Sequence, residues 1–178
     1  MAVPRTFSDN RHNRIMSSLY QKRHIACPYN RAQDILAKTL QPSASSGQPQ
    51  VLLLALSEAA VPGAGISKEV VVTFAAAIDP MHFDQPWSVH WHPKGGGLYP
   101  DFDGVLTVRA DDTYKTAILE LVGTYEPPLG AVGEVFDTVV GSRIASATAR
   151  ELLRKLGDDI EKEYRESEHA KPRSTAEE

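Results

Sequence analysis

The sequence contains a single cysteine and no long apolar run, and each shortage excludes a class of protein. With Cys27 alone, no disulfide can form within the chain and no cysteine-rich metal site can be built. No apolar stretch approaches the roughly 18 residues of a membrane-spanning helix. The first residues lack the hydrophobic segment of a secretory signal, although their Arg-rich, acid-poor composition is compatible with a transit peptide. We therefore expect a cytoplasmic protein without stable membrane insertion.

Net charge is also small, at −4 over 178 residues of which 42% are hydrophobic, and this composition predicts one globular domain. The charge is unevenly spread, because basic residues gather before Leu40 and acidic residues gather at 101–112. A basic amino-terminal arm could touch nucleic acid or anionic lipid. Its charges are scattered and are not interleaved with aromatic residues, as a single-strand binding groove would require. We interpret residues 1–19 as a flexible solvated arm and expect no nucleic-acid partner.

The middle of the chain carries strand patterns bounded by turn-forming residues. The predicted strands are 20–27, 51–56, 66–78, 87–92, 105–110 and 114–122, the last two joined as a hairpin across 111–113. A helix is predicted over 29–40, with Asn30 as candidate N-cap. The small and turn-forming residues of 42–49 then predict a loop within the domain.

A long helix is predicted from Ala131 to about Tyr164, because apolar residues recur there at spacings near three and four. Gly141 and Gly157 interrupt the apolar stripe, so a kink or break is expected near Gly141. Between the last strand and this helix lies a double-proline elbow, Gly123–Gly130. The order of elements predicts an α+β fold in which a curved antiparallel sheet wraps around a long C-terminal helix. The expected organisation is a single domain over 20–166 and a disordered tail over 167–178.

The runs Leu-Thr-Val-Arg at 106–109, Thr-Ala-Ile-Leu-Glu-Leu at 116–121 and Gly-Thr-Tyr-Glu-Pro-Pro-Leu-Gly at 123–130 precede a long amphipathic helix. This arrangement resembles the SRPBCC superfamily, the START-like, helix-grip group that includes the birch pollen allergen and bacterial polyketide cyclases. The resemblance covers about 23–165 and is strongest from Trp87 onward. It implies one strand more than the six predicted, which we place in 95–102. Members include carriers, cyclases and chaperone activators, so the fold does not settle the function.

His90 and His92 share one face of a predicted strand, with Trp91 on the other. They allow three interpretations: half of a metal site completed by Asp101, Asp103 or Glu120, a solvent-facing pair, or a cavity acid or base. We favour the solvent face and expect no metal.

Arg109 and Glu120 lie on the outer face if the hairpin is tight, and point inward if its register is shifted by one residue. We favour the outer face for both. The hydroxyl of Tyr125 could face a ligand, but a hydrogen bond to its own loop is the favoured interpretation.

The sequence thus predicts a carrier or binding protein for a small hydrophobic molecule, lipid or polyketide-like, held between sheet and helix. It would be a monomer or homodimer and need no cofactor, and we assign no catalytic residue. The alternative is a cyclase- or dehydratase-type enzyme in which His90, His92 or Glu120 transfers a proton. The predicted ligand-binding residues are Phe74, Trp91, Leu106, Leu119, Leu121 and Phe136.

Overall fold

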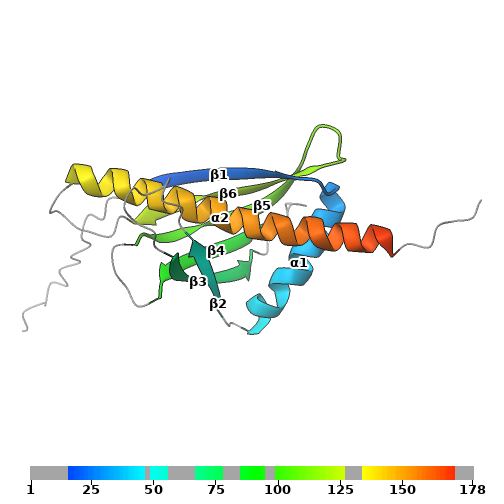
Figure 1. The fold of residues 1–178 in the computed structure, drawn as a ribbon, viewed down its shortest axis with the longest axis horizontal. Coiled ribbons are helices and arrows are strands. Elements are labelled where there is room, and N and C mark those ends of the chain that lie inside the picture. Colours follow the sequence, from blue (N-terminus) through cyan, green and yellow to red (C-terminus); the bar gives the residue numbers. More distant parts are fainter. Residues whose placement is uncertain are drawn as a thin grey trace, which may run out of the picture.

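The computed structural model describes residues 16–46, 49–55, 67–77, 85–94, 99–126 and 134–170. Its elements are β1 (Ser17–Ile25), α1 (Tyr29–Ser46), β2 (Gln50–Ala55), β3 (Ser67–Ala76), β4 (Trp87–Pro93), β5 (Asp101–Ala110), β6 (Ala117–Glu126) and α2 (Glu134–His169). Figure 1 shows α2 lying across the sheet, with α1 beside its C-terminal half. The predicted α+β, helix-grip architecture is therefore confirmed.

The six strands form one antiparallel sheet in the order β1-β6-β5-β4-β3-β2. Residues opposite one another share a face, so the register lines side chains up in rows. One row on the helix-covered face runs through Trp91, Phe102 and Tyr125, and a second contains Leu106 and Leu121. All five residues are buried. We call this helix-covered side of the sheet the inner face.

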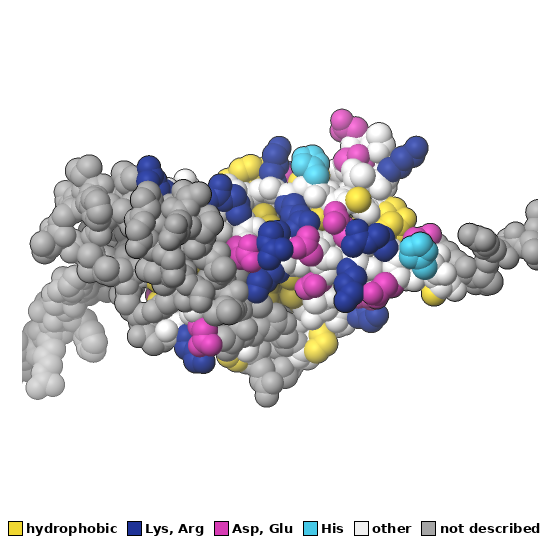
Figure 2. Space-filling view, in the orientation of Figure 1, with side chains coloured by type: hydrophobic (Ala, Val, Ile, Leu, Met, Phe, Trp, Pro, Cys, Tyr) yellow, Lys and Arg dark blue, Asp and Glu magenta, His cyan; other side chains and the backbone are white. Residues whose placement is uncertain are grey.

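The other side of the sheet, which we call the outer face, is exposed. Tyr20, Val105 and Val122 lie there with 53%, 40% and 49% of their surface accessible. On the opposite side of the molecule, Figure 2 shows side chains of both signs mixed along the outward surface of α2. Neither helix in the described part of the chain is long and apolar enough to cross a membrane.

Helix α1 extends further than the sequence suggests. The predicted loop at 42–49 is wrong for 42–46, because Pro42 lies inside the helix. Ala44 packs against the core, and this burial outweighs the poor helix propensity of the proline. The predicted N-cap is also wrong, because Ala32 N donates to Pro28 O at 2.9 Å and so places the cap position at Pro28.

Three strands also differ from their predicted boundaries by three residues or more. β1 begins at Ser17, so 17–19 belong to the strand and not to the predicted arm. β5 begins at Asp101, inside the segment 95–102 to which the extra strand was assigned, and β6 runs from Ala117 to Glu126. The first part of the predicted elbow, 123–126, is therefore strand. Residues 123–125 pair with both β1 and β5, and Glu126 pairs with β5 alone.

The β5–β6 turn is longer than predicted and is organised by one carboxylate. Asp111 accepts hydrogen bonds from the hydroxyls of Thr113 and Thr116, the latter at 2.7 Å, and from both of their backbone amides. These bonds, led by that of the Thr116 hydroxyl, hold the pKa of Asp111 below its ordinary value. Tyr114, with φ of 57°, adopts the left-handed conformation that closes the turn.

Helix α2 continues through both Gly141 and Gly157, so the predicted break is wrong. Ile144, Leu152, Leu156 and Ile160 are buried along the predicted stripe. The helix also runs to His169, past the start of the predicted tail. Residues 1–15 of the predicted arm, 127–133 of the elbow and helix start, and 171–178 of the tail lie outside the described residues. The first half of the proposed extra-strand segment, 95–98, lies outside them as well.

Candidate functional site

The predicted ligand-binding residues from the strands all lie on the inner face. Phe74 is 3% exposed, and Trp91, Leu106, Leu119 and Leu121 are completely buried. They come from β3, β4, β5 and β6, which alternate their side chains so that one face meets the helices. Phe136 lies in α2, but its side chain is outside the described residues. The inner face thus brings together the strand side chains that the sequence predicts.

A pair of stacked aromatic rings lies flat on the middle of the inner face. The rings of Trp91 and Phe102 have centroids 3.9 Å apart and an interplanar angle of 14°. Phe102 can lie against the sheet because its ring covers Gly104 and Gly123, which are opposite one another on β5 and β6 and have no side chain. The two large rings therefore extend along the sheet and not up toward α2.

A hydrogen-bonded hydroxyl pair links the sheet to α2 at one end of this face. The buried Tyr99 hydroxyl contacts Thr148 Oγ1, and Thr148 in turn donates to Ile144 O at 2.8 Å. Burial raises the pKa of Tyr99 to about 12, so this phenol stays protonated at neutral pH. Sequence reasoning missed Tyr99 and Thr148. The position of Thr148 four residues after Ile144, on the apolar stripe, was the available signal.

Two further polar atoms are buried among these apolar side chains. Tyr125 is 3% exposed and Trp87 is 5% exposed. Within the described part of the chain, neither the Tyr125 hydroxyl nor the Trp87 indole nitrogen has a hydrogen-bond partner. The indole of Trp91, by contrast, donates to Pro100 O at 3.2 Å. The favoured interpretation of Tyr125, a hydrogen bond to its own loop, is thus not seen among the described residues.

The polar residues predicted as candidates for chemistry lie on the outer face. His90 is bonded to Asp103, with Nδ1 and Oδ1 2.8 Å apart, and His92 is exposed. Glu120 accepts from Arg109 at 3.2 Å and from the Tyr20 hydroxyl at 3.0 Å. The predicted outer-face positions of the histidines and of the Arg109–Glu120 pair are confirmed, although the Glu120 side chain is only 14% exposed. Proton transfer in the interior by His90, His92 or Glu120 is therefore excluded, because all three point away from it.

No group of three or more metal-ligating side chains occurs among the described residues. The outer-face histidines have ring centroids 5.7 Å apart, and Asp103 is bonded to His90, but these side chains do not form a set of three metal ligands in the described part of the chain.

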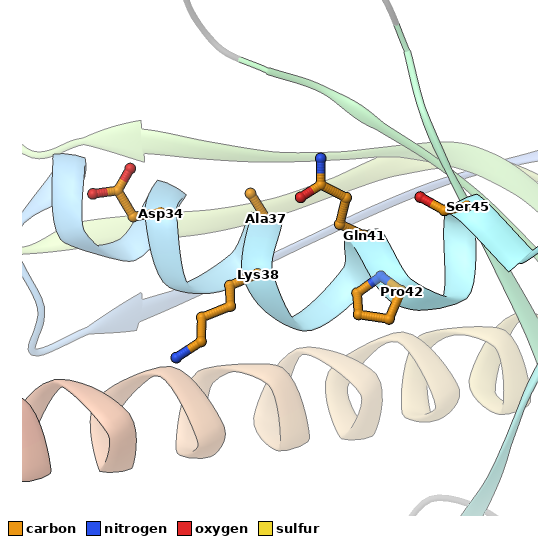
Figure 3. Close-up of a pocket in the computed structure, with 6 residues that line it drawn as sticks. All are labelled: Asp34, Ala37, Lys38, Gln41, Pro42 and Ser45. Atoms are coloured by element: carbon orange, nitrogen blue, oxygen red, sulfur yellow. The ribbon is translucent and has the colours of Figure 1, made fainter.

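A separate groove of about 500 Å³ lies along α1. Its described lining consists of Asp34, Ala37, Lys38, Gln41, Pro42 and Ser45. In Figure 3 the side chain of Lys38 extends toward α2, where its Nζ lies 2.6 Å from Glu163 Oε1. This groove is open, and it is not the predicted space between sheet and C-terminal helix.

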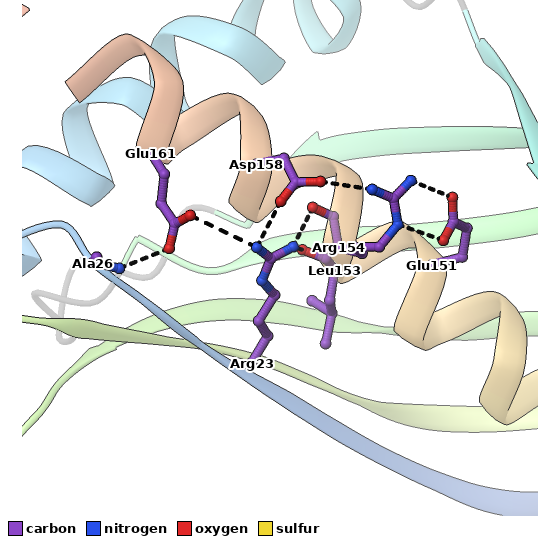
Figure 4. A network of polar contacts seen from close by, with 7 residues as sticks. All are labelled: Arg23, Ala26, Glu151, Leu153, Arg154, Asp158 and Glu161. Atoms are coloured by element: carbon purple, nitrogen blue, oxygen red, sulfur yellow. Dashed lines mark hydrogen bonds and ion pairs between the residues drawn. The ribbon is translucent and has the colours of Figure 1, made fainter. Parts of the chain in front are cut away.

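Among the inner-face side chains that the structure describes, one is a cation, and its guanidinium is hydrogen-bonded to α2 (Figure 4). Arg23 of β1 donates to Asp158 Oδ1 at 2.7 Å and to the backbone carbonyls of Leu153 and Arg154. Its guanidinium lies over Gly157, where a Cβ would come within 2.7 Å of its Nε. Glu161 lies 3.8 Å from the same guanidinium and accepts the amide of Ala26 at 2.8 Å. These hydrogen bonds and ion pairs hold α2 against β1, the edge strand of the sheet.

The thiol of Cys27, the residue that follows β1 and Ala26, is completely buried. Burial raises the pKa of this thiol to about 11. Because only the thiolate reacts, we expect alkylation by iodoacetamide at pH 8 to be about a hundredfold slower in the native protein than in the urea-unfolded chain. Mass spectrometry over a time course measures both rates. Equal rates would contradict the burial of Cys27.

No family model matches this chain. No curated protein matches it either. Solved structures with a similar fold include an aromatase/cyclase from Streptomyces sp. R1128, with 12% identity over 88% of this chain and 98% of that chain and a TM-score of 0.43. A START superfamily protein from Mycobacterium smegmatis has 11% identity over 84% and 98%, with a TM-score of 0.41. Ara h 8.0201 has 12% identity over 85% and 99%, with a TM-score of 0.42. These likenesses concern the fold alone.

Proposed function

We propose that this protein binds a small hydrophobic molecule between the inner face of the sheet and α2, as a carrier in a reducing compartment such as the cytoplasm. The observation that carries the proposal is the pair of buried polar atoms on Tyr125 and Trp87, without partners in the described chain and surrounded by apolar side chains. Buried polar groups nearly always have a partner, and an unpartnered one calls for a missing water or ligand.

The shape of the inner face supports the same proposal. The stacked rings of Trp91 and Phe102 form a flat apolar surface on the inner face, which we call the aromatic floor. Helix α2 also buries small side chains, among them Ala145 and Ala149. A floor of aromatic rings with a few polar groups is the usual lining of a small-molecule site. The binding free energy would come from burial of the apolar surface of the ligand, at roughly 25 cal/mol per Å² before the entropic cost of ordering the ligand and the side chains around it.

We expect Leu119→Trp to weaken binding of the neutral apolar probe N-phenyl-1-naphthylamine at least tenfold, because the larger side chain would enter the space proposed for the ligand. Fluorescence titration measures the affinity. Ile118→Trp is the matched control, since it places the same indole one residue away on the opposite face of β6, and it should leave the affinity unchanged.

Inserting a large side chain into a core costs about 1–3 kcal/mol, so the urea midpoint of both variants is needed to show that they are folded. A folded Leu119→Trp protein that binds the probe as tightly as the wild type contradicts the proposed site.

A further inference from the structure

A row of exposed side chains crosses the middle of the outer face. The register places Tyr20 of β1 and Val105 of β5 opposite Val122 of β6, which lies between them. Ser88 of β4 and Ala75 of β3 continue the same line. All five side chains are exposed, and we call them the central row. Single exposed apolar residues are common, but a contiguous line of them on a sheet is typical of an interaction surface.

Charges of opposite sign lie on the two sides of the central row. On β5, Asp101 lies four residues before Val105 and Arg109 lies four residues after it, so all three point to the outer face. Further charged side chains of β1, β5 and β6 on this face are Asp103 and Glu126 on the Asp101 side, and Lys22 and Glu120 on the Arg109 side. One side is therefore acidic, and the other has an excess of cations.

Asp101 and Arg109 are both accessible to a partner. Asp101 is exposed and forms no ion pair within the described part of the chain. Arg109 is bonded to Glu120 of the neighbouring strand, yet its side chain remains 62% exposed. A guanidinium has five N–H donors, so a second carboxylate can bind to it from the solvent side.

A second copy of the chain fits this distribution of charge. A twofold axis along the central row brings two outer faces together, keeps the order of the strands and reverses their direction. Each residue of the row then meets its own copy, and the Asp101 side of one chain meets the Arg109 side of the other. Packed sheets cross at about 30°, which displaces the ends of β5 by about 7 Å, a distance that an arginine side chain covers.

The area of the outer face suits a weak dimer. The five strands from β1 to β3 lie about 4.8 Å apart and the distance from Asp101 to Arg109 is about 27 Å, so this part of the face covers roughly 650 Å². A typical stable interface buries about 800 Å² on each partner. Because the two sheets cross, they overlap over less than the whole face. We expect a dissociation constant on the order of 10⁻⁵ M.

We infer that this protein forms a homodimer in which two copies pack outer face to outer face about a twofold axis along the central row. Asp101 of each copy forms an ion pair with Arg109 of the other, and the apolar residues of the row are buried between them. The inference is independent of the proposed function, because the ligand is placed on the inner face, on the other side of the sheet.

Sedimentation velocity tests the inference by measuring the dissociation constant. It is run at low salt, where charge pairs are little screened, from tenfold below to tenfold above the expected value. Asp101→Arg and Arg109→Asp each place like charges opposite one another twice in the dimer, so each should weaken it at least tenfold. Asp159→Arg is the control, since it makes the same change of charge at an exposed position of α2, and it should leave the dissociation constant unchanged.

An equimolar mixture of Asp101→Arg and Arg109→Asp is the decisive measurement. In the mixed dimer both contacts again join one carboxylate to one guanidinium. The two variants should therefore bind each other about as tightly as the wild type binds itself, and at least tenfold more tightly than either binds itself. A merely structural effect of the two substitutions would not be reversed by mixing.

Val105→Asp tests the central row, because it places two carboxylates opposite one another on the axis and should weaken the dimer at least tenfold. Urea midpoints show that each variant is folded. A wild-type protein that stays monomeric over the whole concentration range would overturn the inference. A mixture that associates no more tightly than the single variants would overturn the twofold pairing of Asp101 with Arg109, and a dimer unaffected by Val105→Asp would show that the copies meet through another surface.

Discussion

Replacing Gly123 with alanine is expected to lower the free energy of unfolding by about 3 kcal/mol or more, the upper part of the range for overpacked positions. A Cβ at this position would lie 2.2 Å from Asp103 O and 2.6 Å from Gly104 Cα, both backbone atoms of the neighbouring strand. It would also lie 2.6 Å from Cζ of Phe102. Backbone atoms in the centre of a paired sheet cannot rotate away, so β5 and β6 would have to separate or the Phe102 ring would have to leave its position.

Urea unfolding followed by tryptophan fluorescence measures this effect. Gly104→Ala should show a comparable loss, because its Cβ would meet Val122 O at 2.4 Å. Val122→Ala is the control on the same strand, since its side chain is 49% exposed on the outer face and β-propensity alone changes stability by less than about 1 kcal/mol. A Gly123→Ala protein as stable as Val122→Ala would show that the aromatic floor is not held by the glycine pair.

The division of the sheet into two faces could be predicted from the sequence. Apolar and polar residues alternate along each strand, and successive side chains point to opposite faces. The alternation therefore determines which residues face inward, because a shift of one residue would expose every apolar side chain. Leu119 and Leu121 therefore had to share a face opposite Glu120, and the structure buries the two leucines and exposes the Glu120 side of the strand. The outward position of His90 follows in the same way from buried Trp91.

Contacts between distant segments could not be predicted. Gly123 was interpreted as part of an elbow because a glycine before two prolines is typical of a turn. In the structure it is an inner-face position of a central strand, and its lack of a side chain makes room for Phe102. The contact of Arg23 with α2 spans more than a hundred residues of sequence, and that of Tyr99 with Thr148 spans 49. Local patterns of period two or 3.6 contain no information on such partners.

Replacing Arg23 with alanine is expected to lower the free energy of unfolding by roughly 2 kcal/mol, because the charged hydrogen bonds to α2 and the packing of the stem over Gly157 are both lost. Lys22→Ala is the control, as the neighbouring side chain lies exposed on the outer face.

The hydrogen bond from Arg23 is the first cause of the lowered pKa of Asp158. A carboxylate with a lowered folded-state pKa stabilises the fold above its unfolded value near 4 and loses this contribution as the pH falls. The difference between wild type and Arg23→Ala should therefore shrink below pH ~4.

The substitution Gly157→Ala, made with and without Arg23, distinguishes the contact between Arg23 and Gly157 from a general effect on helix stability. With Arg23 present, the new Cβ would lie 2.7 Å from Nε and 2.8 Å from Cζ of a guanidinium held in place by Asp158 and two carbonyls, so the substitution should destabilise the protein. With Arg23→Ala, the close neighbours of that Cβ are gone, and alanine should stabilise the helix by about 1 kcal/mol through its propensity. The effect of the same substitution thus changes sign between the two backgrounds. Additive effects in this double-mutant cycle would mean that Arg23 does not lie on Gly157 in solution.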